Sequence, residues 1–180
     1  MYFESYMKLS TLLLFVLLIA ASFQPKRILV IKAGEQVDGL KLKNSKVQDA
    51  LEKYGENSGF SQGIACGDHD YHTNRYTFSK QGVTVISETI DNEDREQSPI
   101  TKIGITHPCN AVTEMGISFE RDDIDKIIAV YGYPDNSDSS SKYIEIHYTT
   151  KGISFKCDRT TKSIKKMEVY SIGKNPDFAY

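Results

Sequence analysis

The chain has 180 residues, of which 39% are hydrophobic and 26% charged, and its formal net charge is −2. This length allows one domain of ordinary size or two small ones, and the composition excludes an intrinsically disordered chain. Acids and bases are evenly mixed, so there is no basic face that could release counterions from DNA or RNA. We therefore expect no nucleic-acid partner.

Residues 1–23 read as a targeting segment. Residues 9–23 carry no charge, and this apolar block is shorter than the roughly 20 residues of a membrane-spanning helix. Lys8 before the block and the small residues 20–22 near its end are typical of a secretory signal peptide. The basic residues 26–27 that follow also allow an uncleaved membrane anchor, and the sequence leaves the two open. Either one predicts an exported protein, in the periplasm or anchored on the periplasmic or outer side of a membrane.

The rest of the chain contains an internal repeat. Residues 39–55 align without a gap to residues 116–132, and both stretches begin and end on glycine. Apolar residues coincide at positions 40/117, 42/119, 47/124, 50/127, 51/128 and 54/131. Such self-similarity predicts two copies of one structural unit. The first repeat spans 28–106, the second spans 107–171, and residues 172–180 form a C-terminal tail.

Each aligned block predicts a short amphipathic helix. Val47, Ala50, Leu51 and Tyr54 fall at i, i+3, i+4 and i+7, which is one stripe of a helix with 3.6 residues per turn. Ser45 with Gln48 three residues later has the pattern of a capping box, and Asp122 is the equivalent cap in the second copy.

Three strands are predicted after each helix. Alternating apolar residues mark strands at 143–148, 153–157 and 164–170 in the second copy, and at 75–78, 83–87 and 100–106 in the first. We therefore predict an α+β protein. It consists of two tandem units, each with one helix and an antiparallel three-stranded sheet, and the helices lie on one face of the sheet.

The loop at residues 66–72 reads Cys-Gly-Asp-His-Asp-Tyr-His, and these are side-chain types that bind divalent metals. It falls in an insertion of the first copy, whose counterpart at residues 135–142 is a plain polar loop. No zinc-type spacing accompanies His69 and His72. We predict a solvated loop, with no metal ligand, no cofactor and no catalytic residue. A metal-dependent enzyme built on this loop is the less favoured alternative.

The three cysteines have different expected roles. Cys157 alternates with Ile153 and Phe155 on an inward face and is predicted to be a buried thiol. Cys66 and Cys109 can form a disulfide if the domain lies in an oxidising compartment. The odd number of cysteines leaves that pairing open.

Three motifs in the second copy carry a resemblance to a known family. They are a glycine followed by alternating apolar residues at 116–119, the run Tyr-Gly-Tyr-Pro-Asp at 131–135, and the turn Lys-Gly-Ile at 151–153. The pattern resembles the repeat of the β-lactamase inhibitor protein (BLIP)-like superfamily. It is also similar to the small outer-membrane assembly lipoproteins of the SmpA/OmlA type. The first copy departs from the pattern at 56–57, where it lacks the proline and the aspartate.

The resemblance implies a binding module that presents a sheet surface to a protein partner, as bacterial inhibitors, immunity factors and envelope scaffolds do. No partner-contacting residue of the family maps onto this chain by a motif. From the alternation of the strands alone, the outward face mixes aromatic and charged side chains, as protein interfaces do. An ordinary solvated sheet face is the alternative for each of them. The candidate binding residues are Tyr143, Glu145, His147, Lys156, Glu168 and Tyr170.

We therefore predict a non-enzymatic, exported or membrane-anchored module that binds another protein, of the inhibitor or immunity type. An envelope assembly or structural factor is the alternative. The N-terminal segment, if uncleaved, adds contact with a membrane.

Overall fold

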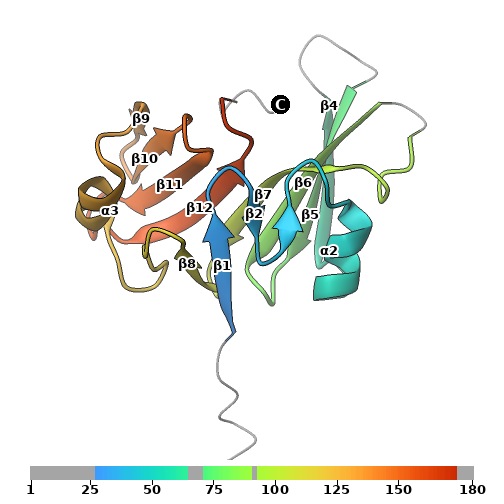
Figure 1. Ribbon diagram of the computed structural model, residues 1–180, viewed down its shortest axis with the longest axis horizontal. Coiled ribbons are helices and arrows are strands. Elements are labelled where there is room, and N and C mark those ends of the chain that lie inside the picture. The colour runs from blue at the N-terminus through green and yellow to red at the C-terminus, as the bar shows by residue number, and fades with distance from the viewer. Residues whose placement is uncertain (1–26, 65–70, 91–92, 174–180) are drawn as a thin grey trace, which may run out of the picture.

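The computed structural model describes residues 27–64, 71–90 and 93–173 (Figure 1). The predicted targeting segment at 1–23 lies outside these ranges. In chain order the elements are β1 (Ile28–Lys32), β2 (Gln36–Val37), β3 (Leu40–Lys41), α2 (Val47–Tyr54), β4 (Gly59–Ile64), β5 (Tyr71–Phe78), β6 (Val83–Ile90), β7 (Ile100–Thr106), β8 (Asn110–Thr113), α3 (Ile124–Tyr131), β9 (Asn136–Ser139), β10 (Tyr143–Tyr148), β11 (Ile153–Asp158) and β12 (Ile164–Tyr170). Across these ranges no helix has the length and apolarity needed to cross a membrane.

One eight-stranded antiparallel sheet organises the molecule, in the order β4-β5-β6-β7-β12-β11-β10-β9. It consists of two up-and-down runs of four strands, which meet where β7 pairs with β12 and places Gly104 opposite Glu168. A second sheet has the order β3-β2-β1-β8, and in it β1 and β8 run parallel with Val30 opposite Val112. Figure 1 shows this small sheet between α3 on the left and α2 on the right.

The predicted fold class, two tandem units of one helix and three strands each, is wrong. Each run has a fourth strand, β4 or β9, the two runs merge into one sheet, and a separate four-stranded sheet is present. The missed fourth strands, β4 and β9, are the two edge strands of the large sheet, and all four residues of β9 are exposed. An edge strand that buries neither face needs no apolar alternation. Pairing β7 with β12 also satisfies backbone groups that two separate sheets would leave at open edges.

The helices occupy the predicted stretches, but their caps differ from the prediction. Lys46 precedes α2, and its backbone N–H donates to the Asp49 carboxylate at 2.8 Å. At α3 the capping side chain is Asp123, which accepts from the backbone N–H of Lys126 at 2.9 Å. Both caps thus lie one residue later than predicted, because a sequence pattern alone fixes a helix start only to within a residue or two.

A single hydrophobic core lies between the large sheet and the layer formed by the helices and the small sheet. We call the side of the large sheet that faces this core the inner face. One complete row of it runs across five strands, formed by Val85, Ile103, Val169, Ile153 and Tyr148. Because side chains alternate along a strand, the neighbouring residues point to the opposite side, the outer face.

The motif at residues 131–135 has a structural role. The ring of Tyr131 packs 5.2 Å from Tyr148 and 5.5 Å from Phe155, and the Tyr148 hydroxyl donates to the carbonyl of Gly132 at 2.8 Å. The Asp135 carboxylate accepts from the backbone N–H of Thr150 at 2.8 Å and from two threonine hydroxyls. The motif therefore ties the end of α3 to the turn between β10 and β11.

The Asp135 contacts predict a pH dependence of stability. Hydrogen bonds from Thr150, first of all from its backbone N–H, hold the pKa of Asp135 below its usual range. A carboxyl group whose folded-state pKa is lowered stabilises the fold above its unfolded-state pKa, and this contribution is lost as pH falls through the folded-state value. We expect Asp135→Asn to make stability fall less steeply below about pH 4. Urea unfolding of both proteins from neutral to acidic pH measures this, and parallel curves would contradict it.

Candidate functional site

The six predicted binding residues all lie on the outer face of the large sheet. Tyr143, Glu145 and His147 come from β10, Lys156 from β11, and Glu168 and Tyr170 from β12. The register places Lys156 opposite Glu145 and places Ser154 opposite both His147 and Glu168. The alternation of each strand thus brings side chains that are up to 27 positions apart in the chain onto one surface.

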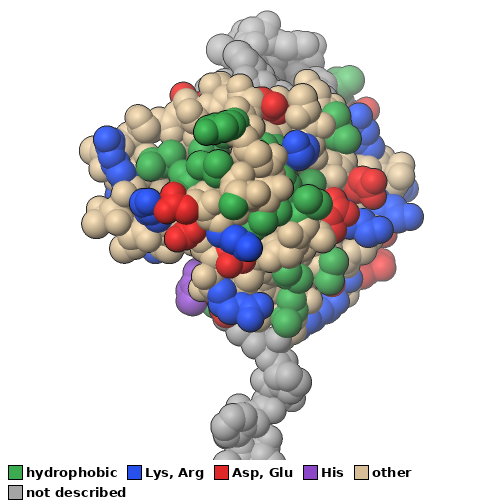
Figure 2. Space-filling model, turned by 60° about the vertical axis from the view of Figure 1, so that its left-hand side comes forward, with side chains coloured by type: hydrophobic (Ala, Val, Ile, Leu, Met, Phe, Trp, Pro, Cys, Tyr) green, Lys and Arg blue, Asp and Glu red, His purple; other side chains and the backbone are tan. Residues whose placement is uncertain are grey.

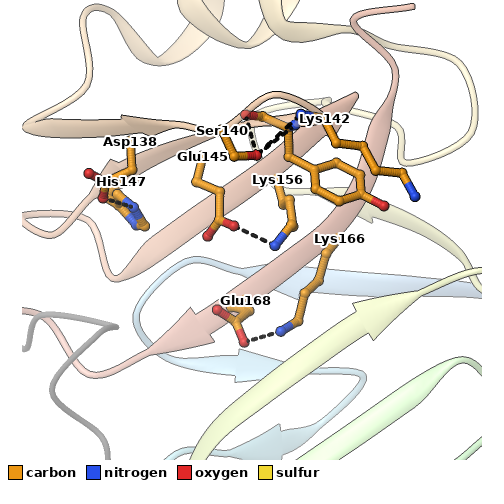
Figure 3. A network of polar contacts seen from close by, with 9 residues as sticks. Asp138, Ser140, Lys142, Glu145, His147, Lys156, Lys166 and Glu168 are labelled. Atoms are coloured by element: carbon orange, nitrogen blue, oxygen red, sulfur yellow. Dashed lines mark hydrogen bonds and ion pairs between the residues drawn. The ribbon is translucent and has the colours of Figure 1, made fainter. Parts of the chain in front are cut away.

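Two ion pairs lie side by side on this surface (Figure 3). Lys156 Nζ lies 2.5 Å from Glu145 Oε1, and Lys166 Nζ lies 2.7 Å from Glu168 Oε1. The side chains of the first pair are about one-third exposed, at 34% and 35%. Lys156 Nζ also lies 4.8 Å from the centre of the Tyr143 ring, a distance at which a cation is attracted to an aromatic face. The charges on this face are therefore held in fixed places.

Glu168 is the best shielded acid of the group. Burial opposes its ionisation, but the cations of Lys166, Lys102 and Arg75 outweigh burial and hold the pKa of Glu168 below its usual range. The Glu168 side chain is therefore an anion at neutral pH in a partly desolvated setting. Such charges interact more strongly with a partner than fully hydrated ones do.

Two of the six side chains are buried and cannot anchor a partner directly. Tyr170 is 2% exposed and its hydroxyl donates to the carbonyl of Ile153 at 3.2 Å. His147 is 3% exposed, and its Nε2 lies 3.5 Å from the carboxylate of Asp138 on β9. The accessible part of the predicted group is therefore Tyr143, Glu145, Lys156 and the edge of Glu168.

The outer face extends beyond the predicted residues into the first half of the chain. A cross-strand row continues from Glu168 through Gly104 on β7 and Thr84 on β6 to Thr77 on β5. Gly104 has no side chain, and a Cβ added there would be in ordinary contact with Lys166 and Thr84, at 3.6 and 3.7 Å. The side chains of Lys166 and Thr84 therefore border the position above Gly104. The alternation of Ile103 and Ile105 with Gly104 in the sequence already indicated that the outer face continues onto β7.

The surface on the α3 side of the molecule shows the same mixed character. In Figure 2, Lys and Arg side chains stand in small groups next to Asp and Glu side chains, and neither sign dominates the view. A surface of this kind discriminates partners by the pattern of its charges and not by a strong overall field.

The other predicted sites lie partly outside the described residues. His69 and Cys66 are outside them, so the metal alternative and the pairing of Cys66 with Cys109 stay predictions. His72 is on β5, and Cys109 is buried next to the start of β8. Among the residues that the structure describes, no group of three or more His, Cys, Asp or Glu side chains could hold a metal ion. Cys157 is a buried free thiol, as predicted, and burial raises its pKa to about 12.

No protein-family model matches the chain, and neither a curated protein nor a solved structure matches it at a significant level. The resemblance to the BLIP-like superfamily and to the SmpA/OmlA-type lipoproteins therefore stays a prediction.

Proposed function

We propose that this chain is an exported, non-enzymatic module that binds another protein through the outer face of its eight-stranded sheet, in the manner of an inhibitor or immunity protein. The observation that carries the proposal is the one-sided packing of the sheet. The helices, the small sheet and the core cluster lie on the inner side, and the core cluster includes no outer-face side chain. The outer face instead presents an aromatic ring and ordered charges.

The arrangement suits a complementary protein surface in three ways. The ion pairs are already formed, so less side-chain entropy is lost when a partner orders them. Tyr143 offers a broad ring held by the ammonium groups of Lys156 and Lys142, at 4.8 and 5.2 Å from its centre. Gly104 places no side chain of its own at the centre of the face, so a partner meets the side chains of Lys166 and Thr84 there. Aromatic residues and ordered charges of this kind dominate the energetics of protein interfaces.

The test combines capture with a charge-swap variant. The tagged full-length chain is first used to recover a soluble protein at near-equal amount from a native extract. The double variant Glu145→Lys with Lys156→Glu keeps the ion pair on β10 and β11 but reverses its direction. We expect it to weaken the captured complex by at least about tenfold in Kd, which is about 1.4 kcal/mol.

The matched control is Lys126→Glu, because this exposed residue is on α3, on the other side of the sheet. It should leave the Kd unchanged within about twofold, and circular dichroism should be the same for all three proteins. A partner whose affinity is equally insensitive to both changes would rule out the outer face as its binding site. Recovery of membrane proteins in place of a soluble one would argue for an envelope assembly factor.

A further inference from the structure

The inner face of the large sheet has a polar cluster where the core would be expected to continue. Asn74 on β5 and Ser87 on β6 lie opposite each other, and both are fully buried. Thr89, 2% exposed, is the next inner-face residue along β6, and its hydroxyl accepts from the Asn74 side-chain amide at 2.7 Å. Gln62 on β4 lies opposite Asn74, and His72 lies opposite Thr89. A patch of five polar side chains thus occupies the inner side of β4 to β6.

In the second half of the chain, the residues equivalent to Asn74 and Ser87 are apolar and pack in the core. Asn74 lies eight residues before the turn glycine Gly82, and Ser87 lies five residues after it. The residues at the same distances from the turn glycine Gly152 are Ile144 and Cys157, which also lie opposite each other. Cys157 is part of the hydrophobic core and Ile144 packs against it. The polar pair of the first half therefore replaces an apolar pair.

The replacement leaves polar atoms unsatisfied. Within the described part of the chain, neither the side-chain oxygen of Asn74 nor the hydroxyl of Ser87 has a hydrogen-bond partner, although both atoms are buried. Unpaired buried polar groups destabilise a fold, so those that occur in a native structure call for a hydrogen-bond partner, such as an ordered water or a bound ligand. The apolar pair of the second half would be the stabilising choice at this position.

A hollow of about 530 Å³ opens next to this cluster. It is lined from the strands by Gln62, His72, Thr89 and the single apolar residue Ile90, and from the connection between β6 and β7 by Glu93, Asp94 and Arg95. Its volume falls within the range of about 300–1,000 Å³ that is usual for small-molecule sites. Thr89 belongs to both the hollow and the buried cluster, so a ligand in the hollow can contact the residue whose hydroxyl accepts from Asn74.

The side chains that line the hollow determine which kind of ligand can bind there. The lining holds two carboxylates against one guanidinium, and this excess of acidic groups disfavours an anion. The carboxylates of Glu93 and Asp94 are held as acceptors by the backbone N–H groups of Ile90 and Glu96, each at 3.0 Å. An apolar ligand would leave the amide and hydroxyl groups unpaired. Groups that both donate and accept hydrogen bonds, which means hydroxyls, match the amide, imidazole, hydroxyl and carboxylate groups present.

An aromatic surface lies next to the hollow. Phe60 shares the inner face of β4 with Gln62, is 45% exposed, and packs 5.0 Å from the ring of Tyr76. The guanidinium of Arg95 lies 5.8 Å from the centre of the Phe60 ring, which joins this ring to the lining of the hollow. An exposed ring next to hydroxyl-binding groups offers an apolar surface to the C–H face of a sugar ring.

We propose that this hollow binds a neutral saccharide of one or two sugar units, as a free sugar or as the end of a glycan chain. The site is on the inner side of β4 to β6, so it is separate from the outer face and does not depend on the function proposed for that face.

Ligand-observed NMR and calorimetry on the full-length protein test the proposal. The probes are neutral mono- and disaccharides, the corresponding uronic acids, and a soluble neutral polysaccharide. We expect at least one neutral sugar to bind, with its uronic acid bound at least about tenfold more weakly. Binding of the polysaccharide alone would identify a chain end as the source of the ligand, whereas binding of the short sugars identifies a free saccharide. Absence of binding to every neutral probe would overturn the proposal.

The internal repeat supplies the decisive variant. The double substitution Asn74→Ile with Ser87→Cys copies the pair that the second half uses, so we expect a higher unfolding midpoint together with loss of sugar binding. Gln62→Leu, on an exposed edge strand, is a milder change that should weaken binding at least about threefold if the double variant does not fold. Sugar binding that survives both changes at unaltered affinity would place it elsewhere and overturn the proposal.

Discussion

Replacing Gly152 with alanine should lower the free energy of unfolding by roughly 2–5 kcal/mol, a large part of the total stability of a domain. Gly152 has a φ of +68°, in the left-handed region where a Cβ costs about 1–2 kcal/mol. A Cβ at this position would also lie 2.3 Å from the carbonyl oxygen of Tyr170 and 2.5 Å from the Cα of Gly34. Both contacts are with backbone atoms, which cannot rotate away.

The close approach at Gly152 joins the two sheets. Its carbonyl accepts from the N–H of Gly34, in the turn between β1 and β2, at 3.1 Å, and from the N–H of Tyr170 on β12 at 3.0 Å. A methyl group at this point would push the small sheet away from the turn between β10 and β11. We therefore expect amide hydrogen exchange in β1 and β2 to accelerate more than exchange in β5 and β6.

Gly116→Ala is the matched control for Gly152→Ala. Gly116 has a φ of +85°, yet an added Cβ there would meet no atom within 4 Å. This variant includes the conformational cost without the clash, so chemical unfolding should show a clearly smaller loss of stability. Equal losses in the two variants would mean that the contact between the sheets contributes nothing beyond the backbone conformation.

Local elements of this fold were predictable wherever the chain has a buried face. The stripe formed by Val47, Ala50 and Tyr54 predicted α2, because a helix that covers a core must repeat apolar residues every three to four positions. The alternation from Tyr143 to Tyr148 predicted β10 for the equivalent reason. The same alternation identified the side chains of the outer face.

Edge strands and the pairing between the two halves of the large sheet were not predictable by the same reasoning. Residues 136–139 read Asn-Ser-Asp-Ser and form β9 through backbone hydrogen bonds to β10 alone. The pairing of β7 with β12 depends on which strand edges meet in space, and no local pattern encodes it. The burial of His147 and Tyr170 on the outer face also depends on neighbours that are distant in sequence.

The two copies of the repeat make equivalent contacts through different residues, and the sequence alignment does not reveal this. In the second copy, Asp135 donates its backbone N–H to the carbonyl of His147 and accepts with its side chain from the following turn. In the first copy Ser58 does both, donating its N–H to the carbonyl of Thr77 and accepting from the N–H of Ser79 at 2.9 Å. A serine hydroxyl substitutes for the carboxylate, so the motif at 131–135 is absent from the first copy although its contacts are present.

Removing the ring of Phe155 should lower the free energy of unfolding by about 3–5 kcal/mol, through lost apolar burial and the cavity left behind. Phe155 is 1% exposed and lies between the rings of Tyr131 on α3 and Tyr148 on β10, with centres 5.5 and 6.2 Å away. The Phe155→Ala cavity would therefore open between α3 and the sheet, where the neighbouring rings can move only as far as their own contacts allow.

Urea unfolding measures this loss, and Tyr133→Ala is its control, because Tyr133 is 91% exposed and should change stability by no more than about 0.5 kcal/mol. The Phe155→Ala variant also distinguishes an effect on stability from an effect on partner binding. Its neighbours Ser154 and Lys156 point to the outer face, whereas its own ring points to the core. Phe155→Ala should therefore reduce the folded fraction but leave the partner affinity of the folded protein unchanged, the opposite of the charge swap at Glu145 and Lys156. A stability loss below about 1 kcal/mol would show that α3 does not pack on this ring.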